Sequence, residues 1–126
     1  VRNLGRLVEV VRVVANFRYD GVSLATDDPF FVADQAYTIK SVTGRIEVAG
    51  IDVGGVTAVV RKAPSGTALA SGTALHSGSL NLKGTAATNQ ALTLTETSLA
   101  SGDALCFDLT GVSTGASGVV TVVLEA

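Results

Sequence analysis

The sequence predicts an all-β fold, an antiparallel β-sandwich of the jelly-roll type with about eight strands. Two observations favour it. Runs with strand-like apolar alternation recur along the chain, and glycine-bearing turns separate these runs at short intervals. The 126 residues are the length of one domain with its own core. We expect residues 1–20 to form an N-terminal arm or first strand, and residues 21–126 to form the sandwich body.

Two stretches in the second half carry the clearest strand pattern. Residues 105–109 alternate strictly, and residues 119–125 place three aliphatic side chains on one face. Such period-two patterns are typical of strands that pack one face on a core. Further strands are expected at residues 56–62 and 92–95. The predicted inward-facing residues of the two clearest strands are Leu105, Phe107, Leu109, Val120, Val122 and Leu124.

The longest predicted strand covers residues 37–48. Its apolar phase changes along the run, and a change of phase within one strand predicts a β-bulge, here near Lys40-Ser41. The residues expected to face the core are Tyr37, Ile39, Val42, Ile46 and Val48.

The first segment is ambiguous. Between residues 4 and 14 a polar residue recurs every third position, which also suits an amphipathic helix. Five valines between positions 8 and 14 oppose the helix, because β-branched side chains lose χ1 freedom there. We therefore expect a strand or an extended arm.

The low charge content indicates a covered surface. Charged residues make up 16% of the chain, against about 25% in an average soluble domain. A weakly charged surface suits a protein largely covered by other subunits, and the alternative is a monomer coated with Ser and Thr. The net charge of −2 excludes nucleic-acid binding by the whole chain. The sequence contains no run of about 20 apolar residues, so it predicts no membrane span.

The charge is unevenly placed. The first 18 residues carry four basic residues against Glu9, a balance of +3, so the remainder carries −5. A basic end on an acidic body is an electrostatic handle for a partner. The alternative is that these arginines are the solvated edge of an ordinary strand. The predicted partner-binding residues are Arg2, Arg6, Arg12 and Arg18.

Four apolar residues lie on the strand faces opposite the expected core. Apolar side chains on both faces of a strand predict a second covered surface, which in an oligomer is the subunit interface. The predicted interface residues are Val59, Cys106, Val119 and Val123.

The sequence predicts no catalytic, cofactor-binding or metal-binding site. His76 is the single histidine and Cys106 the single cysteine, so a zinc site with four N/S ligands is excluded. Nothing local joins the two into a nucleophile–base pair, and we expect His76 to be a surface residue in a Gly/Ser-rich hairpin. Asp27-Asp28 leaves a calcium site open, although no D-x-D-x-D spacing is present. The chain contains no tryptophan, so the sequence does not indicate glycan binding. Glycan binding stays open as an alternative.

Three stretches, residues 27–42, 59–69 and 99–105, resemble the capsid decoration (cement) proteins of tailed phages and related virion jelly rolls. This resemblance implies a structural, non-enzymatic role on the outer surface of a capsid. It implies binding between capsomers to the major capsid protein as an oligomer, often a homotrimer. The location implied is the virion, after synthesis in the host cytoplasm, and the single cysteine fits a reducing compartment.

Three other functions remain open at this point. One is a head-fibre or tail-associated attachment module, and another is a carbohydrate-binding or adhesin-like β-sandwich. The third is an enzyme, which the missing constellation of catalytic residues disfavours.

Overall fold

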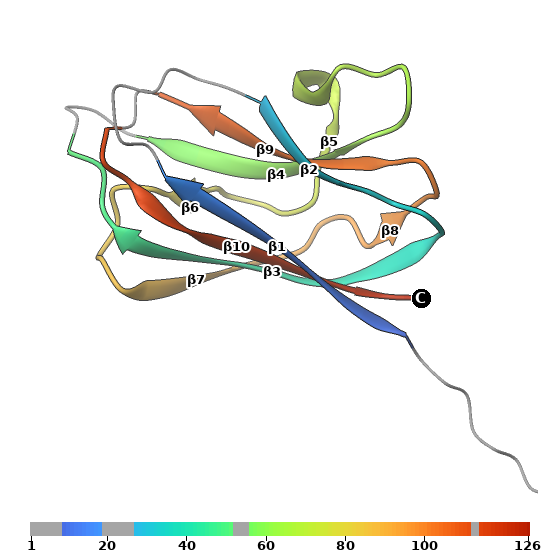
Figure 1. Ribbon diagram of the computed structural model, residues 1–126, viewed down its shortest axis with the longest axis horizontal. Coiled ribbons are helices and arrows are strands. Elements are labelled where there is room, and N and C mark those ends of the chain that lie inside the picture. Colours follow the sequence, from blue (N-terminus) through green and yellow to red (C-terminus); the bar gives the residue numbers. More distant parts are fainter. Residues whose placement is uncertain (1–8, 19–26, 52–55, 112–113) are drawn as a thin grey trace, which may run out of the picture.

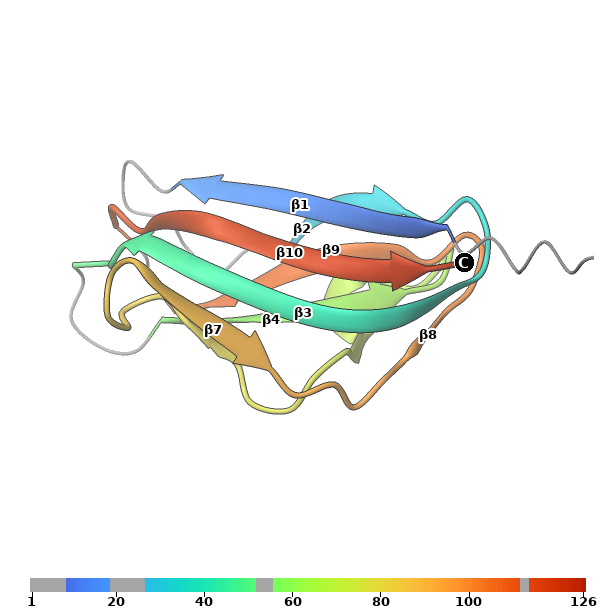
Figure 2. The same ribbon diagram turned by 90° about the horizontal axis from the view of Figure 1, so that it is seen from below.

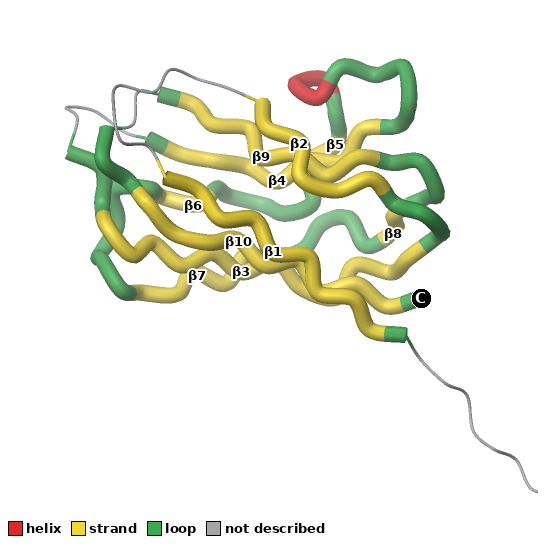
Figure 3. The backbone as a smooth tube through the Cα atoms, in the orientation of Figure 1, coloured by secondary structure: helices red, strands yellow, loops and turns green. Residues whose placement is uncertain are grey.

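The computed structural model describes residues 9–18, 27–51, 56–111 and 114–126. Two antiparallel sheets lie face to face (Figure 1), and strands dominate the described residues (Figure 3), with one short 3₁₀ helix, η1 (Leu69–Ser71). The strands are β1 (Val10–Arg18), β2 (Asp27–Val32), β3 (Tyr37–Val48), β4 (Thr57–Ala63), β5 (Thr73–Ala74), β6 (Leu80–Asn81), β7 (Thr88–Leu92), β8 (Ser98–Leu99), β9 (Ala104–Thr110) and β10 (Ser117–Glu125).

The strand order is that of a jelly roll. One sheet, here sheet I, has the order β1-β10-β3-β7, with β8 also pairing β3. The other, sheet II, has the order β2-β9-β4-β5, with β6 also pairing β4. The short strands β5 and β6 follow one another along β4, and β7 and β8 do so along β3, so the ten strands make eight positions. The predicted jelly-roll sandwich is confirmed.

The core lies between the sheets and follows the expected alternation. On β9, Leu105 and Leu109 are fully buried, and on β10 Val122 and Leu124 are too. Burying each such side chain contributes about 1.5–3 kcal/mol. The largest fully buried side chains are Ile39, Ile46, Leu75, Leu80, Leu82, Leu99, Leu105, Leu109, Leu124, Val42, Val56 and Val60.

Strand β3 contains the predicted bulge and a second one. Its register against β10 shifts between Ile39 and Ser41, which leaves Lys40 as the extra residue. A second shift leaves Glu47 extra near the end of the strand. Each bulge moves the following side chains to the other face. The expectation that Val48 faces the core was therefore wrong, and this side chain is 51% exposed.

Strand β1 settles the ambiguity over residues 10–18. All nine residues pair antiparallel with β10, from Val10 opposite Glu125 to Arg18 opposite Ser117. Val13 is buried, and Phe17 packs against the core. The helix alternative is wrong for this stretch because an unbroken ladder to β10 is available. Residues 1–8 and 19–20 lie outside the described residues, so the division at residue 20 stays a prediction.

Candidate interaction surfaces

The outer face of sheet I carries exposed apolar side chains. On β1, Val10 is 44% and Val14 56% exposed. Val119 and Val123 are half-buried on the next strand, β10, and their neighbours Val120, Val122 and Leu124 point into the core. Two of the four predicted interface residues therefore share one sheet face. Figure 2 shows the strands of this sheet in order, with β1 at its rim.

Charge is sparse on the middle of this face. The register puts Thr121 between Val14 and Thr43, a row without a charged side chain. An ion pair on this face joins Arg45 Nε to Glu47 Oε2 at 2.9 Å, and Arg45 also donates to Asn89 Oδ1 at 3.1 Å. A hollow of about 410 Å³ lies beside it, around Gly118. The face thus combines an uncharged stripe with a charged margin, the usual anatomy of a protein interface.

The outer face of sheet II is covered by the chain itself. Cys106 is fully buried there, with its Sγ 3.8 Å from the carbonyl oxygen of Leu69 in η1. The segment carrying η1 folds over the outside of this sheet (Figure 1). The prediction that another subunit covers Cys106 is therefore wrong. Val59 is half-buried on the same face, so the four predicted interface residues divide between two opposite faces.

An ion pair holds this cover in place. Arg61 Nε donates to Asp108 Oδ2 at 2.8 Å, and its Nη1 donates to the carbonyl oxygen of Gly72 at 3.2 Å. Both charged side chains are about three-quarters buried, at 26% and 20% exposed. Arg61 thus joins β4 to β9 and to the end of the η1 segment, which binds the cover to the sheet beneath it.

The predicted partner-binding arginines are only partly described. Arg12 and Arg18 both lie on β1, are exposed, and point to the outer side of sheet I. Arg2 and Arg6 lie outside the described residues. The two described arginines are therefore part of a strand edge and not of a separate arm.

His76 is not the surface residue expected from its Gly/Ser-rich surroundings. It is 3% exposed, and its Nε2 accepts a hydrogen bond from the backbone N–H of Val60 at 3.0 Å. Nδ1 therefore carries the proton and donates to the carbonyl oxygen of Ser77 at 3.2 Å. Burial lowers the pKa of His76, so the ring is neutral. It completes the hydrogen bonding of β4 where neither β5 nor β6 pairs with that strand, which is a structural role.

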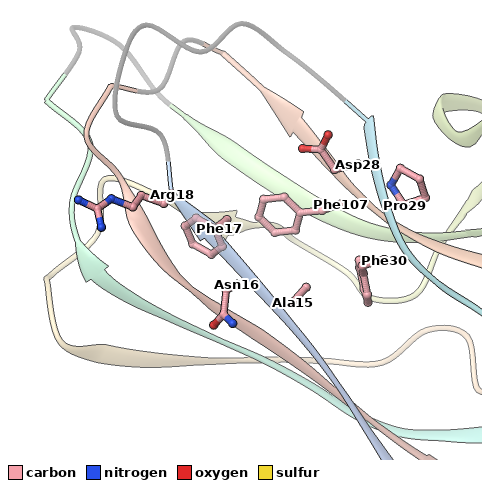
Figure 4. Close-up of a pocket in the computed structure, with 8 residues that line it drawn as sticks. All are labelled: Ala15, Asn16, Phe17, Arg18, Asp28, Pro29, Phe30 and Phe107. Atoms are coloured by element: carbon pink, nitrogen blue, oxygen red, sulfur yellow. The ribbon is translucent and has the colours of Figure 1, made fainter.

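A cleft opens between β1 and β2, at the margin where the two sheets part. Its volume is about 420 Å³. Phe17 of β1 stacks on Phe107 of β9, with ring centroids 5.2 Å apart, and Phe30 reaches in from β2 (Figure 4). Asp28 and Arg18 belong to its polar rim. The concentration of aromatic residues in the first 37 positions signals this cluster, but the sequence does not show that the cluster borders an opening.

Gly118 makes the stacking of Phe17 possible. A Cβ at this position would overlap the carbonyl oxygen of Arg45 on β3 and lie 2.9 Å from Phe17 Cζ. Only glycine lets the ring lie across β10 while β10 stays paired to β3. Any larger residue would push Phe17 out of the cleft or separate these two strands.

Two further acidic residues, Asp103 and Asp34, have local hydrogen-bond partners. Buried Asp103 accepts a hydrogen bond from the N–H of Ala100 at 2.9 Å and so closes the turn before β9. Tyr37 donates to Asp34 Oδ1 at 2.6 Å, and this bond raises the pKa of the phenol. Within the described ranges, no three His, Cys, Asp or Glu residues are grouped to hold a metal ion. The possible calcium pair gains no support, since Asp28 lies on β2 without such a group.

No helix in the described residues is both long and apolar enough to cross a membrane.

Comparison with known proteins supports the fold. No protein-family model and no curated protein matches the sequence. Among solved structures, the chain is similar to one in the acidic stable capsid of Helicobacter pylori bacteriophage KHP30. The TM-score is 0.55 at 13% identity, over 95% of this chain and 94% of that one. A chain of the infectious bursal disease virus Gx strain gives a TM-score of 0.45 at 13% identity, over 94% of this chain and 32% of that one. The fold is thus a jelly roll of a kind that occurs in a phage capsid.

Proposed function

We propose that this protein is a structural component of a virion, which decorates and stabilises the outer surface of a phage capsid. It binds the major capsid protein between capsomers as an oligomer, most simply a homotrimer. The observation that carries the proposal is the likeness to a chain of a phage capsid structure, which extends over 95% of this chain and 94% of that one. The sequence resemblance to decoration proteins points the same way.

The outer face of sheet I supports the oligomer. Val10, Val14, Val119 and Val123, here called the valine stripe, share this face with uncharged Thr121 and Thr43, and Arg12 lies beside Val123 on the same face. An exposed apolar stripe of this kind on a weakly charged protein is typical of a surface that a subunit covers. Each valine contributes up to about 1.5–3 kcal/mol when fully covered.

The basic N-terminal region supports the orientation on the capsid. Arg12 and Arg18 are exposed on β1, and Arg2 and Arg6 precede them in the sequence. The rest of the chain carries a balance of −5, so an acidic partner surface attracts this end and repels the body. The arginines set orientation and association rate more than affinity, because an exposed ion pair contributes only about 0–1 kcal/mol.

The test is to mix the purified protein with undecorated phage capsids and count bound copies by cryo-electron microscopy. We expect density at fixed symmetry sites on the outer surface. Sedimentation at micromolar concentration should give a multiple of the 12.7 kDa chain mass. Capsids that remain bare at saturating protein would contradict decoration, and a clean monomer in solution and on the capsid would contradict the oligomer.

A further inference from the structure

We propose that the sandwich has an acid-sensitive seam, formed by residues 75–77 where they pair with residues 93–96. At the seam the imidazole of His76 completes the hydrogen bonding that joins sheet II to sheet I. In mild acid the ring takes up a proton and leaves β4, and the seam opens between two ties that remain closed. This inference concerns a conformational switch within the fold and does not depend on the proposed function.

The seam connects the two sheets on the side of the sandwich away from β1. On one side of it, the N–H of Leu75 donates to the carbonyl oxygen of Val60 on β4, in sheet II, at 3.0 Å. On the other side it bonds to the chain between β7 and β8, which both pair with β3 of sheet I. There the N–H of Thr95 donates to the carbonyl oxygen of Leu75 at 2.9 Å, and His76 forms an antiparallel bridge with Leu94.

One hydrogen bond of this connection comes from a side chain that can change its charge. The N–H of Val60 donates to Nε2 of His76 at 3.0 Å, and the ring is 3% exposed. Nδ1 already uses its proton toward the carbonyl oxygen of Ser77. A protonated imidazole carries a donor on both nitrogens. Its Nε2–H would then point at the N–H of Val60, so the charged ring cannot keep this position.

The surroundings of the ring set the direction of the pH effect. Burial lowers the pKa of His76, and the positive charge of Arg61 lowers it further. Arg61 is itself paired with Asp108, and the other charged side chains of this region, Lys62 and Glu96, pair with each other. In the opened seam the ring regains the ordinary value of about 6.5. Opening is therefore favoured as the pH falls below about 6.5, by up to about tenfold per pH unit.

Two ties on either side of His76 do not titrate in this range. On one side Lys62 Nζ lies 3.3 Å from Glu96 Oε1 and also donates to the carbonyl oxygen of Ser98. The N–H of Ser98 and the charge of Lys62 lower the pKa of Glu96, so this carboxylate stays ionised while His76 gains its proton. On the other side the backbone of Asn81 and the side-chain amide of Gln90 exchange two hydrogen bonds of 2.9 Å, which are uncharged. Acid therefore opens the middle of the seam alone.

The opening would uncover apolar side chains of the core. Leu75 is fully buried, and Leu94 packs against the core cluster. Both lie at the seam, between the two ties. A fall in pH is thus converted into newly exposed apolar surface, while the long pairing of β10 with β1 and β3 is kept.

Amide hydrogen exchange of the full chain, followed by NMR between pH 7.5 and pH 5.5, tests the seam. After correction for the intrinsic effect of pH on exchange, we expect the amides of Val60 and Thr95 to lose about tenfold in protection. The amides of Asn81 and Ser98, which belong to the ties, should keep theirs. Low urea concentrations should not change exchange at the seam, but should accelerate it in β10, whose amides need global unfolding.

Two variants separate the titrating groups. His76→Gln can still accept a hydrogen bond but does not titrate, so protection of the seam amides should be equal at both pH values. Its matched control, Glu96→Gln, removes the other titrating side chain of the seam, and the tenfold change should persist. Wild-type protein gives an independent measurement. The ring protons of His76 should titrate below pH 6.5, and the amide shift of Val60 should change with the same midpoint.

Four results would overturn the proposal. The first is a His76 ring that titrates at about pH 6.5 without any change at the amide of Val60. The second is the same urea dependence at the seam and in β10, which would mean that no local opening exists. The third is a pH dependence that survives in His76→Gln. The fourth is a pH dependence that disappears in Glu96→Gln, which would assign the switch to that carboxylate. None of these results depends on whether the protein binds capsids.

Discussion

The outer faces of the two sheets both carry apolar residues, but they differ in how these residues are covered. Both carry apolar residues on strands whose other side is core: Cys106 and Val59 on sheet II, Val119 and Val123 on sheet I. On sheet II the η1 segment folds over Cys106, and the Arg61–Asp108 pair holds it there. On sheet I the described residues provide no such cover, and Val14 remains 56% exposed.

The difference shows that an apolar outer face is not by itself evidence of a partner. Apolar residues on an outer face can also be covered by a loop of the same chain, as they are on sheet II. Only the three-dimensional arrangement tells which face is still open. Among the described residues, the outer face of sheet I is the less covered of the two, and the valine stripe lies on it.

Introducing the same polar residue into each face should give the largest contrast. Cys106→Gln adds volume and an amide beneath the η1 segment, so we expect a loss of about 3 kcal/mol in the free energy of unfolding. Val123→Gln on sheet I should change it by about 0.5 kcal/mol. Urea unfolding followed by circular dichroism measures both.

A second measurement separates stability from assembly. Val123→Gln should shift the sedimentation pattern toward monomer, because it places an amide in the proposed subunit interface. Equal destabilisation by the two substitutions, with an unchanged sedimentation pattern, would mean that both faces are covered within one chain. In that case the valine stripe would lose its role.

His76 should give the next largest effect, and it lies on the covered side. His76→Ala leaves the N–H of Val60 without its partner, which costs about 2 kcal/mol in the free energy of unfolding. The effect should also depend on pH. Burial lowers the pKa of His76 in the folded state, so the unfolded chain binds the proton more readily. Stability should therefore fall as pH drops below about 6.5, the ordinary histidine value.

Unfolding curves between pH 8 and pH 5 test this dependence. His76→Gln is the control, since its side chain can still accept a hydrogen bond but does not titrate. The part of the pH dependence that comes from His76 should disappear in this variant. An unchanged pH dependence would show that His76 is not the titrating group.

The smallest contrast concerns the ion pairs of the two faces. Arg61→Ala removes the partner of Asp108 and a bond to Gly72, and because both groups are about three-quarters buried we expect a loss of about 1 kcal/mol. Arg45→Ala removes an exposed pair on sheet I and should cost between about 0 and 0.5 kcal/mol. Thermal unfolding at low and high salt measures the difference. A larger effect at Arg45 would mean that a partner or a further segment desolvates the face of sheet I.

Much of the fold was predictable because burial of one strand face leaves a direct mark in the sequence. The alternation at Leu105, Phe107 and Leu109 set the inward face of β9, and the phase change after Ile39 located the bulge at Lys40. The second bulge at Glu47 escaped prediction, because only one expected inward residue, Val48, follows it. A single residue is too short a pattern to show a change of phase.

The surfaces were less predictable, for a physical reason. Whether Cys106 and His76 are buried depends on segments that fold back onto strands. The local sequence pattern does not show these contacts. The aromatic residues near the N-terminus indicated a cluster, but its position at an opening depends on how β1 and β2 part at the margin of the sandwich. The position of β1 at the end of the strand order of sheet I is likewise a property of topology.

The position of β10 has a consequence for biogenesis. This strand follows all the others along the sequence, yet it lies between β1 and β3 in sheet I. During synthesis β1 and β3 therefore leave the ribosome before β10, the strand that pairs with both of them. Pairing β1 with β10 closes a loop nearly as long as the whole chain, and contacts of such high order make folding slow. The jelly roll thus closes only after β10 emerges, and until then the exposed strands are vulnerable to aggregation.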